Sequence, residues 1–296
     1  SADASVRVKG DLNDFPFVDG RKGIFKVHVR ARGVDVDYAE GWPRIENATA
    51  DFLLQGKQME VTVPSAMTAG ARLQKVGVTL PDMLSDKLLL QVRGEQEGDI
   101  AHCLEFIQKS PVRGYLSGFT DGVVASGTGK LQLQLAIPLA GPEPVKVTGS
   151  YHFAGNDVDF GRYLPTARKV EGDLLFTESV VHTQNITAQI LGGPANLQIE
   201  SGAGGAINAR LKGSTNLDNL NRLAPPPLLQ KLHGGAPWEM EVAVQGAQSR
   251  IVLDSNLAGV QSDLPAPLNK PASESLALHF EQNSTGPQQE TLSLQY

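Results

Sequence analysis

The sequence is poor in the residues that most often carry chemistry. One cysteine, Cys103, occurs among 296 residues, which excludes an internal disulfide. Because Cys103 falls within an apolar helical pattern, we expect a small buried side chain there. Aromatic residues make up only 6% of the chain, with two tryptophans and five tyrosines. A carbohydrate-active enzyme needs paired carboxylates across a cleft lined with aromatic rings, and the sequence shows no such pair.

Basic clusters and long apolar runs are also missing. The chain has 26 basic and 32 acidic residues, a net charge of −6, and no basic patch with interleaved aromatics, which argues against nucleic acid as a partner. No apolar run approaches the roughly 18 residues of a membrane-spanning helix. Both ends lie within strand patterns and there is no starting methionine. We therefore interpret the chain as an internal segment whose membrane anchor, if any, lies elsewhere.

Motifs for catalysis, phosphate binding or metal binding are not found. The six histidines are scattered, and His28 and His152 fall within strand patterns, where hydrogen-bonded structural roles are expected. The glycine-rich stretches 127–130 and 202–205 lack the Lys-Ser/Thr of a phosphate loop, so we interpret both as turns. No serine-hydrolase or zinc motif is present. The sequence therefore predicts no cofactor, no metal and no enzyme.

Two acidic pairs are candidates for calcium ligands. Asp35 and Asp37, and later Asp157 and Asp159, each alternate onto one face of a predicted strand. The glycine and the distal glutamate of a calcium-binding loop are absent. A solvated strand face is therefore the preferred interpretation of both pairs.

The chain nearly repeats itself at a fixed spacing. A Val-Asp-aromatic triplet, an apolar-Pro pair and an Asp-aliphatic run begin at residues 36, 42 and 51, and again at 158, 164 and 173, each 122 residues later. Further similarities, of residues 67–69 with 186–188 and of 93–94 with 212–213, have a spacing of 119. A constant period is the signature of stacked repeats, each of which buries a face against its neighbour.

Short strands dominate the pattern, and helices are few. Strands of four to nine residues with period-two alternation are bounded by Gly, Pro, Asn and Asp. Asp99 is a good N-cap for a helix over 99–109 that ends before Pro111, and a second helical run covers 216–223 and resumes through Leu232. We expect the first helix to brace a sheet edge. The predicted organisation is leading strands of a preceding unit at 1–35, a first repeat at 36–157 with a helix near 99–110, a second repeat at 158–270 with a helical segment near 216–232, and strands of a following truncated unit at 271–296.

Aliphatic alternation is the main candidate for a functional surface. In Lys130-Leu131-Gln132-Leu133-Gln134-Leu135 every second residue is leucine, as expected for a sheet with one apolar and one polar face. Taken alone, this pattern also fits the core of an ordinary β-sandwich.

Several strings together resemble one family. They are Gly-Trp-Pro-Arg-Ile-Glu at 41–46, Phe-Ile-Gln-Lys-Ser-Pro at 106–111, Ile-Pro-Leu at 137–139, Leu-Gly-Gly-Pro at 191–194, and the stretches 253–260 and 264–270. Together they are similar to the long YhdP-type members of the AsmA-like superfamily of Gram-negative bacteria, over about residues 6–270. These motifs are structural, so they indicate the family well and its chemistry hardly at all.

The resemblance implies a fold and a function. It implies a mainly β fold with a few short helices, in which elongated, curved antiparallel sheets from two related repeat units form a taco-like groove. It also implies a periplasmic protein, anchored in the inner membrane by a segment absent from this chain, that moves phospholipid between inner and outer membranes as the related bridge-like lipid-transfer proteins do. The acyl chains would contact apolar strand residues, for which the candidates are Phe52, Leu54, Leu88, Leu90, Val92, Leu131, Leu133, Leu135, Ile137, Met240, Val242 and Val244.

An alternative function explains the same features. A structural or assembly module of the envelope, acting in outer-membrane protein assembly, would have the same repeat and the same alternation around a sealed core. The two functions differ in whether the apolar face is open and continuous. In either case the exposed sheet edges of a truncated segment are expected to pair readily with a second copy.

Overall fold

The structure is a computed structural model, and it is almost entirely β. It describes residues 1–18, 20–115, 120–161, 165–202, 206–221, 227, 229–246, 248–286 and 289–296. Three parts of the sequence patterns lie outside these residues: the repeat anchor at Leu164, the glycines of 203–205, and the stretch 222–226 with its first two prolines. The mainly β class with a few short helices, as predicted, is confirmed.

Seventeen strands of the described part belong to one antiparallel sheet, and two more form a small sheet. The large sheet contains β1 (Ala2–Gly10), β2 (Gly23–Val36), β3 (Ile45–Gln55), β4 (Gln58–Thr68), β5 (Ala71–Leu80), β6 (Leu89–Asp99), β7 (Val124–Ser126), β8 (Thr128–Pro138), β9 (Lys146–Asp159), β10 (Ala167–Thr177), β11 (Val181–Ile190), β12 (Gly193–Ser201), β13 (Ile207–Ser214), β15 (Pro237–Gln245), β16 (Gln248–Ser255), β18 (Leu278–Gly286) and β19 (Gln289–Gln295). The small sheet pairs β14 (Leu232–Gly234) with β17 (Val260–Ser262).

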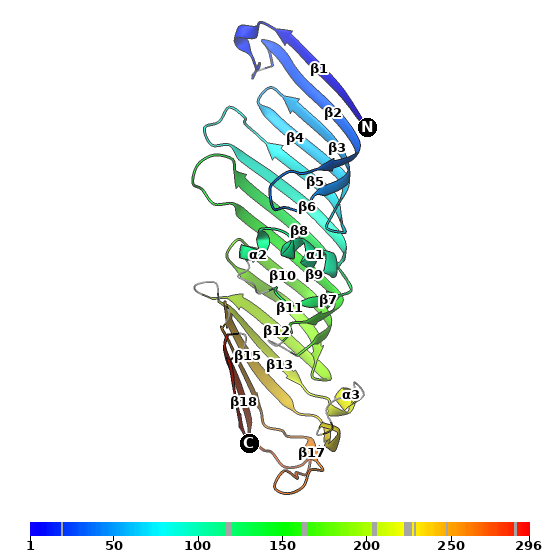
Figure 1. Cartoon of the computed structure of the whole chain (residues 1–296), viewed down its shortest axis with the longest axis vertical. Helices are drawn as coiled ribbons and strands as arrows, with labels where there is room; N and C mark the ends of the chain where they lie inside the picture. The colour runs from blue at the N-terminus through cyan, green and yellow to red at the C-terminus, as the bar shows by residue number, and fades with distance from the viewer. Residues whose placement is uncertain are drawn as a thin grey trace. The chain divides into compact units, whose positions relative to one another are not determined.

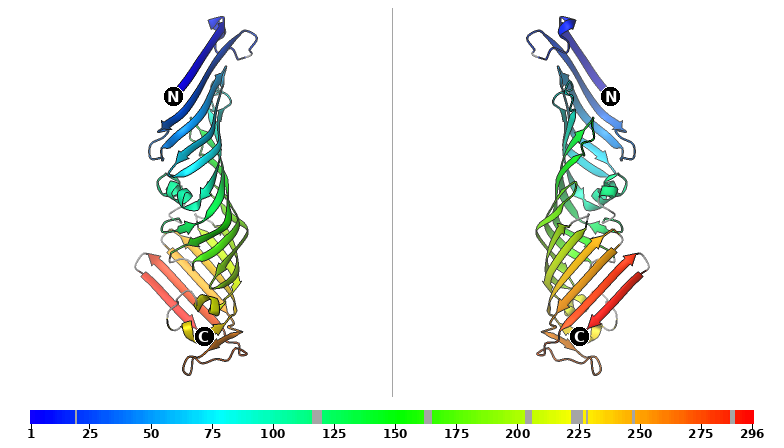
Figure 2. Two further views of the ribbon diagram at one scale, coloured as in Figure 1. Left: turned by 90° about the vertical axis from the view of Figure 1, so that its right-hand side faces the viewer. Right: turned by 90° about the vertical axis from the view of Figure 1, so that its left-hand side faces the viewer.

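The chain folds into two compact units. Unit 1 comprises Ser1–Val112, Gly129–Tyr151 and Phe176–Glu178, and unit 2 comprises Arg113–Thr128, His152–Leu175 and Ser179–Tyr296. In unit 1 each strand from β1 to β6 pairs with the next, and β8 pairs with β6 (Figure 1). In unit 2 the order is β11, β12, β13, β15, β16, β18 and β19, the last two being the red strands of Figure 2. The boundaries of the two sequence repeats are not those of the two units, and they stay a prediction.

The predicted runs locate strands correctly, although several observed strands are longer than the runs. Alternation predicts strands at 24–29, 52–54, 59–63, 130–137, 197–199, 239–244 and 250–253, all of which lie within observed strands, and at 88–92 and 145–153, which begin one residue before β6 and β9. Period two is thus a good guide because each strand has one apolar and one polar face.

Two local geometries recur 122 residues apart. The Asp35 Oδ1 accepts the Asn47 N–H at 2.9 Å, and the Asp157 Oδ1 accepts the Lys169 N–H at 3.0 Å. Both donors have positive φ, 49° and 50°, so each carboxylate holds a left-handed backbone position, which at Asn47 coincides with a register shift between β3 and β4. One aspartate of each acidic pair therefore does more than face solvent, because Asp35 and Asp157 each bind a backbone N–H group.

The turns that follow share the same period. Ala69 (φ 46°) and Gly70 (φ 77°) join β4 to β5, and Leu191 (φ 52°) and Gly192 (φ 80°) join β11 to β12. The spacing is again 122, so the reduced spacing of 119 expected at residues 67–69 was wrong. The change of spacing from 122 to 119 therefore occurs after these turns, because β5 and β12 still begin 122 residues apart.

The helices confirm one prediction and correct another. α1 (Ile100–Gln108) begins after Asp99, whose Oδ1 accepts the Ala101 N–H at 2.9 Å, as predicted. α2 (Val112–Tyr115) follows Pro111. In the described part of the second helical segment, α3 covers Leu217–Asn221 and a 3-10 turn covers Leu229–Lys231, and the expected helical residues 222–223 and 228 lie outside that part. Leu232 begins β14 instead of continuing a helix, because its backbone pairs with Ser262. A further 3-10 turn, Leu12–Asp14, lies between β1 and β2.

One ion pair in unit 1 makes stability depend on pH. The N–H of Val147 and the ammonium of Lys146 each lie 3.0 Å from the Glu178 carboxylate, and they lower its pKa from 4.5 to about 2. A carboxyl with a depressed folded pKa adds stability that is present above pH 4.5 and lost as the pH falls towards 2. We expect Glu178→Gln to flatten the pH dependence of the unfolding free energy in that window.

Urea unfolding at a series of pH values checks this expectation. Glu171→Gln, an exposed position in β10, is the matched control and should keep the wild-type slope. Equal slopes for Glu178→Gln and the wild type would mean that Glu178 titrates alike in the folded and unfolded chain.

Candidate functional site: the apolar face

Unit 1 has one face made of aligned aliphatic rows. The registers place Val27 opposite Leu54, Leu54 opposite Met59, and Met59 opposite Leu80. The neighbouring row extends over six strands, because direct cross-strand pairs stack on the same face. Its members, from β1 to β6, are Ala4, Val29, Phe52, Val61, Val78 and Val92.

The opposite face of unit 1 is polar and tied by ion pairs. His28 Nε2 lies 2.8 Å from Asp51 Oδ1, and this contact lowers the pKa of the Asp51 carboxyl. The Glu95 carboxylate lies 3.0 Å from Lys75 Nζ and 3.2 Å from Lys130 Nζ, and these two ammonium groups lower its pKa. The structural role expected for His28 is confirmed, and the sheet of unit 1 is one-sided.

The structure places the unit 1 candidates on or beside this face. Phe52, Leu54 and Val92 are members of the two rows. Leu90 lies two residues before Val92 in β6 and therefore on the same face. Leu88 lies just outside the strand. In β8 the leucines alternate with Lys130 and Gln132, both of which contact Glu95 on the polar face. The candidates of unit 1 are all half-buried: Phe52, Leu54, Leu88, Leu90, Val92, Leu131, Leu133, Leu135 and Ile137.

α1 covers one end of the apolar face of unit 1 (Figure 1). The Cys103 thiol donates to Gln96 Oε1 at 2.8 Å, and Gln96 lies four residues after Val92 in β6, hence on the same face. The His102 ring is so close to Gly70 that a Cβ there would lie 2.8 Å from it. α1 was expected to brace a sheet edge, but it lies against β5 and β6, each paired on both sides. The reason is local: β6 runs directly into the Asp99 N-cap.

An aromatic contact extends this cover. Trp42, in the loop between β2 and β3, lies 6.0 Å from the Phe106 ring of α1 and 6.1 Å from the Tyr38 ring. Asp37 and Arg44 form a two-bond ion pair, 2.8 and 2.7 Å, that ties the ends of this loop together. The loop and α1 therefore belong to the same end of the strands in unit 1.

Unit 2 has the same one-sided design with a more buried apolar face. One row runs over seven strands, and its central members are Leu211 and Met240. On the opposite face Lys212 pairs with Glu239 at 3.0 Å and Arg250 with Glu281 at 2.8 Å. The row, from β11 to β19, contains Ile186, Leu197, Leu211, Met240, Leu253, Phe280 and Leu294.

The predicted residues of unit 2 are core residues. Met240 and Val242 are 4% exposed and Val244 is 7% exposed, whereas the unit 1 candidates are half-buried. Val242 lies between Ala209 and Ile251, each 6% exposed. The apolar side chains in the middle of unit 2 therefore already cover one another, and those of unit 1 leave surface uncovered.

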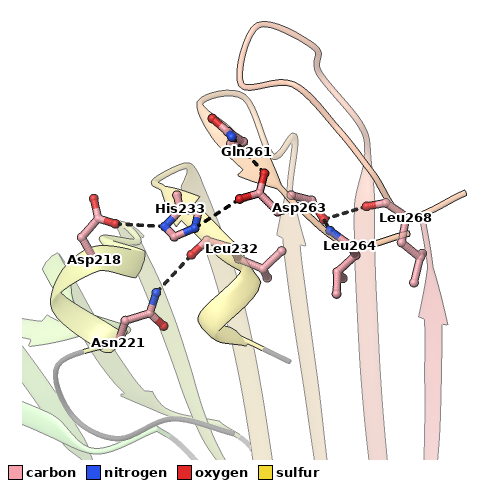
Figure 3. Close-up of polar contacts among 9 residues, drawn as sticks. Asp218, Asn221, Leu232, His233, Gln261, Asp263, Leu264 and Leu268 are labelled. Atoms are coloured by element: carbon pink, nitrogen blue, oxygen red, sulfur yellow. Dashed lines mark hydrogen bonds and ion pairs between the residues drawn. The ribbon is translucent and has the colours of Figure 1, made fainter. Parts of the chain in front are cut away.

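A small cap closes one end of unit 2. Leu217 of α3, Ala236 and Val260 of β17 form a buried cluster. Figure 3 shows how polar contacts join its parts: His233 of β14 lies between Asp218 of α3 (3.7 Å) and Asp263 (3.5 Å). α3 abuts the turn at Gly192, as α1 abuts the turn at Gly70 in unit 1.

The described residues hold no metal-binding cluster of histidine, cysteine and carboxylate groups. His152 is paired with Asp173 at 2.9 Å, as its strand position suggested. Burial raises the pKa of the Cys103 thiol to about 12, so the thiol stays protonated and is a poor nucleophile at neutral pH. In the stretch 127–130, Gly127 connects β7 to β8 and residues 128–130 belong to β8. A strand in this place does not fit a phosphate loop.

Sequence reasoning missed part of the apolar face. Val27, Val29, Val61 and Val78 belong to the same rows as Phe52 and Leu54. The signal was present, because 24–29 and 59–63 alternate, but period two alone does not say which strands are neighbours.

These features define the class of this protein: it is a one-sided antiparallel β-sheet protein that presents an extended aliphatic face. The chain belongs to the YhdP family, because the family model described as YhdP protein matches residues 1–296. The resemblance inferred from the sequence motifs is thereby confirmed.

One relative of this chain is a protein with a named activity. The chain is 25% identical over 286 residues to the intermembrane phospholipid transporter YhdP of Escherichia coli (strain K12). The match covers 93% of this chain and 22% of that protein, so the chain spans about a fifth of its relative. No solved structure matches the chain. None of the helices in the described part is long and apolar enough to cross a membrane.

Proposed function

We propose that this chain is a segment of a periplasmic bridge on which phospholipid acyl chains lie against the apolar face of unit 1. The observation that carries the proposal is the pair of apolar rows in unit 1, most of whose side chains are only half-buried by the protein itself; in these rows Leu80 is buried (7% exposed) and Ala4 is exposed. The whole protein would be anchored in the inner membrane and would move phospholipid between inner and outer membranes. The similarity to the named transporter supports this proposal.

The energetics favour such a surface. Exposing an acyl chain to water costs about 0.8 kcal/mol per methylene, on the order of 13 kcal/mol for a sixteen-carbon chain. Aliphatic rows that continue from strand to strand remove most of this cost at every position. They also offer no convergent polar group that would hold the lipid in one place, so the face suits sliding and not catalysis.

The buried face of unit 2 favours a second candidate function. With Met240 and Val242 only 4% exposed, unit 2 resembles the sealed core of a structural module for envelope assembly. The two functions are compatible if unit 1 holds lipid and unit 2 mainly holds the sheet together. We therefore place the acyl-chain site in unit 1.

Lipid extraction tests the proposal. The chain would be purified without detergent from a Gram-negative host, and its mass and extracted lipids measured by native mass spectrometry. Copurified phospholipid is expected at a defined stoichiometry. A folded protein free of phospholipid would exclude the lipid function for this segment and leave the structural one.

A further inference from the structure

The end of unit 1 opposite α1 is a connected row of loops, which we call the loop rim. It consists of the described residues between β1 and β2 (11–18 and 20–22), β3 and β4 (56–57), β5 and β6 (81–88), and β8 and β9 (139–145). Figure 1 shows these loops along one end of the strands. The Met83 N–H donates to the Lys57 carbonyl at 2.8 Å and the Leu139 N–H to the Leu88 carbonyl at 2.9 Å. The loops thus form one ordered surface.

Apolar side chains project from the loop rim into solvent. Five of them are between 50% and 73% exposed, and a group of such residues is more informative than a single exposed side chain. They occur in three of the four loops, next to the half-buried rows. The five are Leu12, Phe15, Val18, Leu84 and Leu139.

Three lysine–carboxylate pairs lie along the loop rim, one within the first loop and two that each join neighbouring loops. Lys22 Nζ lies 2.8 Å from Asp14 Oδ1, near Leu12 and Phe15 in the sequence. Lys57 Nζ lies 2.5 Å from Asp82, whose other oxygen accepts the Leu84 N–H at 2.9 Å.

The third pair is the loosest. Lys87 Nζ lies 4.0 Å from Glu143 in the loop that follows Leu139. The loop rim therefore repeats one combination three times: exposed apolar atoms beside a positive and a negative charge.

The two ends of the strands in unit 1 differ accordingly. At one end α1 and the Trp42 loop cover the apolar face, with Cys103 bonded to Gln96. At the loop rim the apolar side chains and the paired charges face solvent. A lipid whose tails lie on the rows can present its polar end to water at the loop rim.

We infer that the loop rim carries the headgroups of zwitterionic phospholipids, those with a phosphate and an amine, an inference that rests on the proposed function of unit 1. The phosphate replaces the carboxylate beside each lysine, and the amine replaces the lysine beside each carboxylate. The apolar tips cover the glycerol backbone and the first methylenes. The match is one of charge: each of the three lysine–carboxylate pairs has one positive and one negative group, as the headgroup has.

The weakness of exposed ion pairs suits transport. Pairs of this kind gain little because water and salt screen them, so a headgroup can exchange with them readily. A lone lysine would instead favour anionic lipids, and a lone carboxylate would repel them. Balanced pairs thus prefer a zwitterionic lipid without holding it.

Two sets of variants test the inference. One set removes the positive charges (Lys22→Gln, Lys57→Gln, Lys87→Gln). The other set removes the negative charges (Asp14→Asn, Asp82→Asn, Glu143→Gln). Asp82→Asn keeps an oxygen that can accept the Leu84 N–H. Each protein is loaded from an equimolar mixture of phosphatidylethanolamine and phosphatidylglycerol with identical acyl chains. The readout is the ratio of the two lipids bound, measured by mass spectrometry.

The two sets should move the ratio in opposite directions. Without the carboxylates, the ratio of phosphatidylethanolamine to phosphatidylglycerol should fall by about two- to fivefold, and without the lysines it should rise by a similar factor. The matched control, Lys212→Gln with Glu239→Gln, removes an ion pair from the polar face of unit 2 and should leave the ratio unchanged.

The outcomes separate the two proposals. If the wild type binds no phospholipid, the lipid function itself fails. If all proteins bind phospholipid with the same ratio, the function stands and the loop rim is not the headgroup path. As a second measurement, a photo-crosslinking residue at Leu84 should capture lipid far more than one at Tyr38, at the covered end; equal capture at both would also overturn the inference.

Discussion

Val242→Asp should unfold unit 2. Val242 is 4% exposed and lies between Ala209 and Ile251 in the apolar row, so a carboxylate there would have neither water nor a cation to pair with. Burying an uncompensated charge costs several kcal/mol, on the order of 4 kcal/mol or more, against a total stability of about 5–15 kcal/mol for a domain. Thermal unfolding followed by circular dichroism should show loss of the cooperative transition at ambient temperature.

Its neighbour provides the control. Ala243 is exposed on the opposite face of β15, where its partner across the strands is Arg250. Ala243→Asp adds the same side chain one position away and should change the unfolding temperature little. If Val242→Asp folded as well as this control, the apolar face of unit 2 would be open to water, and the core described above would not exist.

Leu133→Asp should leave unit 1 folded and remove its bound phospholipid. Leu133 is half-buried in β8, with Gln132 and Gln134 on the other face, so a carboxylate keeps contact with water in the lipid-free protein. In the lipid-bound protein the same carboxylate would meet acyl methylenes. The loss of an apolar contact and the added desolvation together predict at least a tenfold drop in bound lipid, because about 1.4 kcal/mol corresponds to a factor of ten.

Lipid extraction and circular dichroism on the same samples measure both effects. Gln134→Asp, on the polar face of β8, is the matched control and should keep wild-type lipid. Retention of phospholipid by a folded Leu133→Asp protein would place the acyl chains elsewhere. Together with Val242→Asp, this pair of variants distinguishes an open apolar surface from a sealed one in the same chain.

The contrast between these two residues shows how far sequence patterns reach. Leu133 and Val242 both stand in strict aliphatic alternation, and both were predicted to line a groove. Their strands were assigned correctly, but the sequence does not say which face of a strand lines a groove, and it does not distinguish a half-buried side chain from one that is 4% exposed. Exposure depends on which other segments cover the strand, and those segments are distant in the chain.

The bulges illustrate a second limit. Lys75 has φ 51° and marks a register shift between Gln74 and Gly77 opposite β6. A lysine gives no sign of a left-handed position, whereas glycine or asparagine does. One extra residue changes which side chains share a face, so a strand assigned correctly can still have an uncertain face beyond the bulge.

The sequence by itself determined the elements. Alternation predicted strands because a one-sided sheet needs period two, Asp99 predicted the start of α1 because its carboxylate accepts a hydrogen bond from a free N–H group, and the strings such as Gly-Trp-Pro-Arg-Ile-Glu at 41–46 identified the family. Only the tertiary structure decided which rows of side chains align. It also decided that α1 covers one end of the apolar face in unit 1, and that the loop rim brings exposed apolar side chains and charge pairs together at the other end. These are contacts between residues far apart in the chain, as between Lys57 and Asp82, and they follow from strand register and packing, which no local pattern specifies.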